Sequence, residues 1–143
     1  MKKSAAASVR RTVIVDAGPL KAAIDRSDDH HAWAVHALRR IPARFLACEA
    51  VITEAQSGLE NHPAGVHALR LLVSRMEVVP MVSGKLAAVF DLVEQWAPRM
   101  DFADACAVAL VHAHADAFVL TTDFRNFSAY RVPFASPDGA FPG

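Results

Sequence analysis

The chain has 143 residues, of which 53% are hydrophobic, and its 15 lysines and arginines balance its 15 aspartates and glutamates. A chain of this length can bury one hydrophobic core without disulfides or a structural metal, which predicts a single domain. The hydrophobic content excludes a largely disordered protein. The zero net charge argues neither for nor against a nucleic-acid partner.

The cysteines and the chain ends indicate the compartment and the domain limits. Cys48 and Cys106, the only cysteines, each lie in an apolar stretch, which is typical of buried free thiols in a reducing compartment. Such thiols predict a cytoplasmic protein. No apolar run approaches the roughly 18 residues of a membrane span, so we expect no membrane partner. Residues 1–11 are basic but lack an apolar segment, which predicts a flexible tail rather than a signal peptide. Residues 12–135 then form the domain, and residues 136–143, rich in proline and glycine, an irregular tail.

Strand and helix patterns alternate along the chain. Apolar and β-branched runs predict strands at 12–15, 44–47, 77–82, 117–120 and 131–134, the last at a sheet edge because it contains Pro133. Amphipathic or apolar runs predict helices at 20–24, 30–40, 49–60, 64–75, 85–96 and 101–110, with turns at 17–19 and 126–130. Asp28 or Asp29 is placed to cap the helix at 30–40. This order predicts a three-layer α/β/α domain with a mainly parallel, about five-stranded sheet.

Four aspartates should meet in this arrangement. Asp16 directly follows the first strand and Asp123 stands just past the strand at 117–120. The carboxyl ends of parallel strands meet at the edge where open α/β sheets hold their ligands. Asp101 and Asp104 are three residues apart, so both lie on one side of the first turn of their helix.

A glutamate on the helix at 49–60 is a further candidate. At about 100° per residue, Glu54 falls on the flank of the apolar face of this helix, whereas Glu49 points nearly opposite. Glu54 is therefore the better candidate for a partly buried carboxylate.

Carboxylates gathered at one edge predict a metal site. They cannot all stay ionised without a cation, because like charges repel strongly in a partly desolvated site. Oxygen-only ligands favour hard ions, which indicates Mg²⁺ or Mn²⁺. Such an ion keeps several waters and can bind a phosphate oxygen, so the natural chemistry is hydrolysis of a phosphodiester.

Each acid also has a structural explanation. Asp101 is equally well placed to cap its helix, with Asp104 completing a capping pattern at the third helical position. Asp16 and Asp123 suit strand-ending turns. Glu54 suits a solvated helix flank.

Other chemistries find less support. None of the seven histidines makes the His-Glu-x-x-His pattern of a zinc site, and there is no glycine-rich phosphate loop or nucleophile elbow. A phosphotransfer domain would place a cation beside its last acid, but no lysine follows Lys85. Candidates for contacts to an RNA backbone are Arg39, Arg40, Arg44, Arg125 and Arg131.

Four motifs, at residues 13–20, 52–55, 100–105 and 120–127, together resemble a PIN-domain ribonuclease of the VapC toxin type, over residues 12 to about 134. The resemblance implies an endoribonuclease with a PIN-like fold and a four-acid site that binds Mg²⁺ or Mn²⁺. The site it implies consists of Asp16, Glu54, Asp104 and Asp123, with Asp101 supporting the metal. It also implies a homodimer held silent by a small cognate antitoxin.

One position departs from the family pattern. Many relatives place another aspartate where this chain has Asn126. Its amide can offer an oxygen or hold a water but lowers the local negative charge, which leaves open whether one or two metals bind. We expect Asn126 and Thr122 to support the metal ligands. Asn126 and the lack of a strongly basic composition also motivate an alternative, a catalytically weak PIN-like scaffold that binds RNA or a partner protein.

Overall fold

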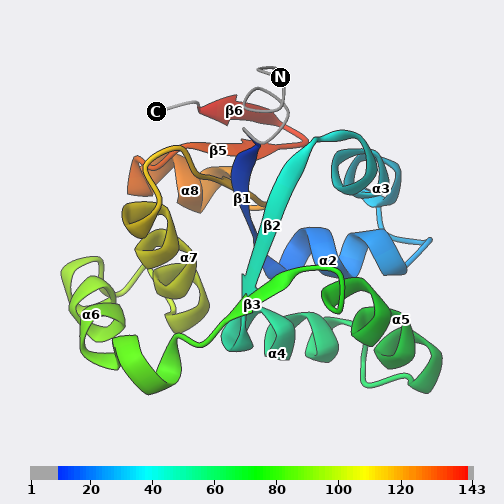
Figure 1. Cartoon of the computed structure of the whole chain (residues 1–143), viewed down its shortest axis with the longest axis horizontal. Helices are drawn as coiled ribbons and strands as arrows, with labels where there is room; N and C mark the ends of the chain where they lie inside the picture. The colour runs from blue at the N-terminus through cyan, green and yellow to red at the C-terminus, as the bar shows by residue number, and fades with distance from the viewer. Residues whose placement is uncertain (1–9, 142–143) are drawn as a thin grey trace, which may run out of the picture.

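The computed structural model describes residues 10–141 and contains a six-stranded sheet in the order β3-β2-β1-β4-β5-β6 (Figure 1). Neighbouring strands from β3 to β5 are parallel, and β6 runs antiparallel to β5. The strands are β1 (Arg11–Val15), β2 (Ala43–Cys48), β3 (Glu77–Val79), β4 (Phe118–Leu120), β5 (Phe134–Ser136) and β6 (Gly139–Phe141). The mainly parallel sheet predicted from the sequence is therefore confirmed, with an antiparallel strand added at one edge.

Helices cover both faces of the sheet. They are α2 (Ala17–Ile24), α3 (His31–Arg40), α4 (Glu49–Gly58), α5 (Pro63–Val73), α6 (Val82–Gln95), α7 (Phe102–Ala113) and α8 (Phe124–Tyr130). In Figure 1, α2, α3 and α5 lie on one side of β1 and β2, whereas α6, α7 and α8 lie on the other. This arrangement confirms the predicted three-layer α/β/α architecture.

The central strand β1 is buried on both faces. Val13, Ile14 and Val15 are each at most 1% exposed. Val13 packs in a cluster with Ala37 of α3, whereas Ile14, on the opposite face of the strand, belongs to the larger cluster that includes Cys106 of α7. A strand covered on both sides needs a continuous apolar run, which is the pattern of this segment.

Two predictions about the whole chain can be compared directly with the structure. Cys48 and Cys106 are both buried free thiols, as predicted. Among residues 10–141, no helix has the length and apolar character needed to cross a membrane.

Helix α2 begins at Ala17 rather than at Leu20. The Asp16 side chain accepts a hydrogen bond from the Ala17 amide at 2.9 Å and caps the helix. Pro19 then falls in the first turn, where its missing amide hydrogen has no helical partner to lose. The turn predicted at 17–19 is therefore wrong.

The predicted cap of α3 is also wrong. His30 occupies the N-cap position and makes no side-chain capping bond. Asp28 accepts a hydrogen bond from the amide of His30, the residue before the helix, at 2.8 Å. The Asp28 side chain therefore orders the turn that precedes α3.

Strand β3 is shorter than the predicted 77–82 and ends at Val79. Pro80 has no amide hydrogen to continue the ladder. The next amide, that of Met81, donates to the Glu49 carboxylate at 2.8 Å, and α6 begins one residue later.

The region after β4 is more regular than predicted. Residues 126–130, predicted as a turn, belong to α8, because the Asp123 side chain caps this helix by accepting from the Asn126 amide at 3.1 Å. Strand β5 begins at Phe134, just past Pro133, and lies between β4 and β6 rather than at the sheet edge.

The predicted tails also differ from the structure where it describes them. Residues 139–141 form β6 within the segment predicted as irregular. Gly139 has φ of 142°, a conformation that side chains disfavour, and its carbonyl accepts from the Ser136 hydroxyl at 2.9 Å, which closes the turn. Of the predicted tail at 1–11, residues 1–9 lie outside the described residues and Arg11 begins β1.

We expect Gly18→Ala to lower the free energy of unfolding by about 1–3 kcal/mol, because the added Cβ would collide with the Thr122 side chain. Urea denaturation measures the change. Gly84→Ala in α6 is the matched control, since its added Cβ meets no atom within 4 Å. Alanine should stabilise that position by about 0.5–1 kcal/mol. Equal effects of the two substitutions would contradict the contact between α2 and the loop before α8.

Candidate active site

Two of the acids are joined at the carboxyl ends of β1 and β4. The Asp16 amide donates to the Leu120 carbonyl at 2.9 Å, which continues the pairing of these strands past the end of β1. The fully buried Thr121 donates through its hydroxyl to Asp16 Oδ2 at 2.8 Å. The same hydroxyl accepts from the Asp123 amide at 3.0 Å. Thr121 therefore links Asp16 to Asp123.

The other two aspartates stand at the start of α7. Asp101 caps this helix by accepting from the Asp104 amide at 2.8 Å, so the structural explanation of Asp101 as a cap is correct. Asp104 does not complete the capping pattern. Its Oδ2 instead accepts from the Tyr130 hydroxyl at 2.8 Å, and the residue is only 8% exposed.

Electrostatic effects show that these acids converge. Burial raises the pKa of Asp16, and the charges on Asp101 and Asp123 raise it further, whereas its hydrogen bonds lower it. Burial also raises the pKa of Asp104, to about 7, with further increases from the charges on the three other aspartates. The structure therefore brings Asp16, Asp101 and Asp123 within electrostatic reach of Asp104.

Glu54 lies beside this group. Partial burial of its carboxylate raises its pKa. The negative charges on Asp101 and Asp16 raise it further, and Asp101 has the larger effect of the two. Glu49 points elsewhere and binds the Met81 amide, which lowers its pKa. The helical spacing thus distinguishes the glutamate that faces the aspartates from the one that does not.

Three of the aspartates serve as helix caps as well. Asp16, Asp101 and Asp123 cap α2, α7 and α8, so three helix N-termini point their free amides at the acids. These amides stabilise negative charge. Each carboxylate oxygen has two lone pairs, so a capping bond leaves room for a cation on the same group.

Asn126 lies next to Asp123, whereas Thr122 contacts α2 instead. The Asn126 amide group donates to Asp123 Oδ2 at 2.8 Å, and its own oxygen accepts from the Arg99 guanidinium at 3.1 Å. The amide nitrogen of Asn126, and not its oxygen, therefore faces Asp123. Thr122 lies against Gly18, and the threonine that contacts an acid is Thr121.

Sequence reasoning missed three residues that contact the site. Thr121 was detectable, because parallel pairing places the first residue after β4 beside the last residue of β1 and its successor. Tyr130 and Arg99 carried no such signal. Tyr130 reaches Asp104 through α8, which was predicted as a turn, and Arg99 reaches Asn126 across a sequence separation of 27 residues.

The donor set fits a hard divalent cation. All five candidates offer carboxylate oxygens, and their mutual repulsion is the electrostatic condition that a bound cation relieves. Within residues 10–141, however, no three His, Cys, Asp or Glu side chains form a ready coordination group. Side-chain adjustment would therefore accompany metal binding.

Comparisons with known proteins identify the fold. No protein-family model and no curated protein matches the chain significantly. VapC20 from Mycobacterium tuberculosis, described as a sarcin-ricin loop cleaving toxin, matches with a TM-score of 0.71 and 19% identity over 82% of this chain and 94% of that one. VapBC2 from Rickettsia felis, bound to a DNA fragment from its promoter, matches with a TM-score of 0.60 and 14% identity over 82% of this chain and 92% of that one. The PIN domain endonuclease Utp24 matches with a TM-score of 0.52 and 18% identity over 87% of this chain and 84% of that one.

The chain therefore has the PIN-domain fold found in VapC structures, which confirms the fold that the sequence motifs implied. At identities of 14% to 19%, the likeness is one of fold.

We expect Asp104→Asn to stabilise the protein in EDTA. A carboxyl whose folded pKa is raised from 3.8 to about 7 makes the folded state lose stability as pH rises through this window. At about pH 8 the substitution should therefore raise the free energy of unfolding by about 1–3 kcal/mol, and at about pH 4.5 by less. Denaturant unfolding at both pH values measures this. Asp116→Asn, at an exposed carboxylate, is the control. A loss of stability in Asp104→Asn at both pH values would contradict the mutual repulsion.

Proposed function

We propose that the chain is a Mg²⁺- or Mn²⁺-dependent endoribonuclease toxin that acts in the cytoplasm and is neutralised by a cognate antitoxin. The observation that carries the proposal is the convergence of four aspartates at the carboxyl edge of a parallel sheet with the PIN-domain fold. VapC20, a neighbour in fold, is a toxin that cleaves the sarcin-ricin loop, which supports RNA as the substrate class.

The acids would divide the work of hydrolysis. Asp16, Asp104 and Asp123 would hold the cation, and Asp101 would support it from the start of α7. A bound Mg²⁺ or Mn²⁺ supplies a Lewis acid that polarises the phosphoryl group and acidifies water. Glu54, on a surface position beside Asp101, would take a proton from the attacking water. Its raised pKa makes it a stronger base than an ordinary glutamate.

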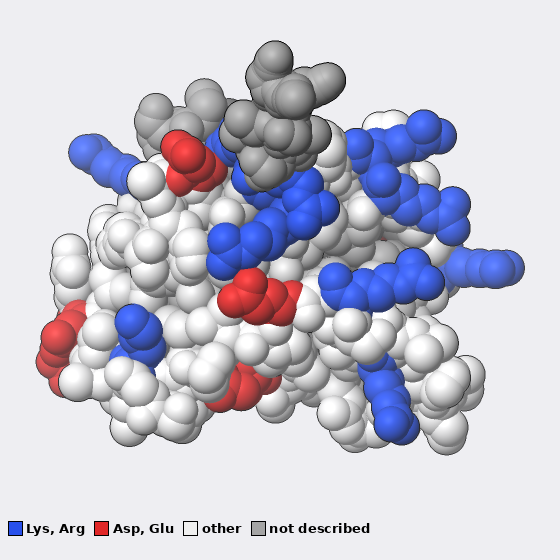
Figure 2. Space-filling view, in the orientation of Figure 1, with Lys and Arg blue, Asp and Glu red and all other residues white. Residues whose placement is uncertain are grey.

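Basic side chains offer contacts to the RNA backbone. Arg39 and Arg40 lie exposed in the last turn of α3. Arg44 lies exposed on β2, where it pairs with Glu77 at 3.1 Å and stands opposite Thr12 of β1, at the sheet edge away from the acids. Figure 2 shows Lys and Arg gathered on the side of the molecule that carries α3. Phosphate contacts from such residues would hold a part of the RNA away from the cleaved bond, without reading its base sequence.

We expect the purified protein to cleave total RNA in Mg²⁺ or Mn²⁺, and we expect EDTA to stop the cleavage. The cleavage rate should fall at least about a hundredfold in Asp16→Asn and in Glu54→Gln. Gel analysis of the cleavage products measures these rates. Glu49→Gln is the matched control for Glu54→Gln. It removes a carboxylate from the same helix, but one that binds the Met81 amide.

Two outcomes would overturn parts of this proposal. Cleavage that survives both EDTA and Asp16→Asn would remove the metal mechanism. RNA binding without cleavage, together with no calorimetric binding of Mn²⁺, would favour the alternative of a PIN-like scaffold.

A hollow between α2, α3 and α5 suits an apolar segment of the antitoxin. It has a volume of about 580 Å³ and includes Leu71 of α5, which is 55% exposed. Arg26, Arg39 and Arg75 also line it. Positive charge beside apolar surface favours an amphipathic helix that carries acidic residues.

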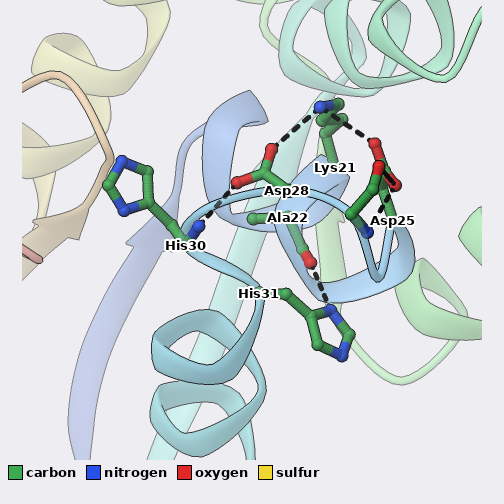
Figure 3. Close-up of polar contacts among 7 residues, drawn as sticks. Lys21, Ala22, Asp25, Asp28, His30 and His31 are labelled. Carbon is green, nitrogen blue, oxygen red and sulfur yellow. Dashed lines mark hydrogen bonds and ion pairs between the residues drawn. The ribbon is translucent and has the colours of Figure 1, made fainter.

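Side-chain contacts join α2 to the loop that follows it and to α3, beside this hollow. Lys21 of α2 pairs with Asp25 at 3.1 Å and with Asp28 at 2.8 Å (Figure 3). Nδ1 of His31, which lines the hollow, lies 2.7 Å from the Ala22 carbonyl oxygen. A hollow with fixed walls binds a partner with less loss of entropy.

A second surface suits the homodimer. Val82, Leu86 and Phe90 follow one another at intervals of four residues on α6 and are 46%, 44% and 48% exposed. This spacing forms one apolar stripe along the helix. Such a stripe is typical of the centre of a protein interface, so we place the contact with a second copy there.

The two surfaces provide controls for each other. Phe90→Glu should convert a dimer into a monomer in light scattering, because it buries a charge in the apolar contact. Leu71→Glu should leave the dimer intact and weaken binding of the candidate antitoxin at least about tenfold. The candidate is the product of a short reading frame adjacent to the gene. An unchanged dimer in Phe90→Glu, or unchanged binding in Leu71→Glu, would contradict the assignment of that surface.

A further inference from the structure

The short helix α8 contacts two of the site's acids from successive turns. Asn126 donates to Asp123 Oδ2 at 2.8 Å, and Tyr130, four residues later, donates to Asp104 Oδ2 at 2.8 Å. Residues four apart lie on one face of a helix. α8 therefore presents a polar face that binds one acid from the β4 edge and one from α7.

Tyr130 is held firmly in its place. The residue is 4% exposed. Its ring packs edge-on against Trp96, with ring centres 5.6 Å apart, and against Phe127, at 5.2 Å. The hydroxyl also lies 3.4 Å from the carbonyl oxygen of Arg99. A ring fixed by two aromatic neighbours presents its hydroxyl at a defined point, so the partner carboxylate is fixed as well.

This bond determines which oxygen of Asp104 is available. Oδ2 accepts from Tyr130, whereas Oδ1 accepts no hydrogen bond from any residue in the described part of the chain. The carboxylate is nearly buried and is surrounded by the charges of three other aspartates. One oxygen is thus anchored and the other is left for a cation.

We propose that Tyr130 is a positioning residue for the metal site: its hydroxyl fixes the Asp104 carboxylate so that Oδ1 is presented to the cation. The inference rests on the proposed function, since it requires that Asp104 binds a divalent ion. Groups that hydrogen-bond to metal ligands typically change metal affinity by about 10–100-fold when they are removed.

Tyr130→Phe tests the inference, because it deletes the hydroxyl and keeps the ring contacts with Trp96 and Phe127. Calorimetric titration of the full chain with Mn²⁺ at about pH 8 should show about 10–100-fold weaker binding than in the wild type. Raising the Mn²⁺ concentration should then restore RNA cleavage by the variant, because the hydroxyl acts on the ligand and not on the substrate.

Ser136→Ala is the matched control. It deletes another buried hydroxyl, one that binds the Gly139 carbonyl at the sheet edge, and should leave Mn²⁺ affinity unchanged. Equal Mn²⁺ affinity in Tyr130→Phe and the wild type would overturn the positioning role. Equal weakening in Tyr130→Phe and Ser136→Ala would also overturn it, since any loss of stability would then explain the effect. Absence of Mn²⁺ binding in the wild type would instead overturn the proposed function on which the inference rests.

Discussion

The repulsion between carboxylates at one edge of the sheet is the constraint that the other contacts of this site offset. Asp16 and Asp104 are nearly buried, and each has its pKa raised by burial and by the charges of neighbouring aspartates. The fold offsets part of this repulsion with helix N-termini, because α2, α7 and α8 all begin at an aspartate whose side chain accepts a backbone amide. The aspartates that cap these helices are therefore also the proposed ligands of the cation.

Hydrogen bonds between side chains organise the acids further. Thr121 joins Asp16 to Asp123, and Tyr130 holds Asp104. Arg99 adds a positive charge that is connected to Asp123 by two hydrogen bonds, with Asn126 between them. The network leaves carboxylate oxygens that a cation can use, and a cation would remove the repulsion that burial imposes. Stability and the proposed function are thus coupled through the same charges.

The sequence was sufficient wherever periodicity and parallel pairing determine position. The apolar run of β1 predicted its burial, and helical spacing separated Glu54 from Glu49. The positions of Asp16 directly after β1 and of Asp123 three residues after β4 predicted that these two acids meet. The sequence was insufficient at the C-terminal end. α8 has seven residues, too few for a clear helical period, and its start depends on capping by Asp123. The contacts of Tyr130 with Trp96 and with the Arg99 carbonyl require that α8 lies against the segment between α6 and α7, which no local pattern encodes.

The central claim is that these separated aspartates share one divalent cation. Anomalous diffraction from crystals grown in saturating Mn²⁺ tests it most directly. The account predicts an anomalous peak with oxygens of Asp16, Asp104 and Asp123 within about 2.5 Å. A peak elsewhere, or three aspartates that remain too far apart to contact one ion, would contradict it.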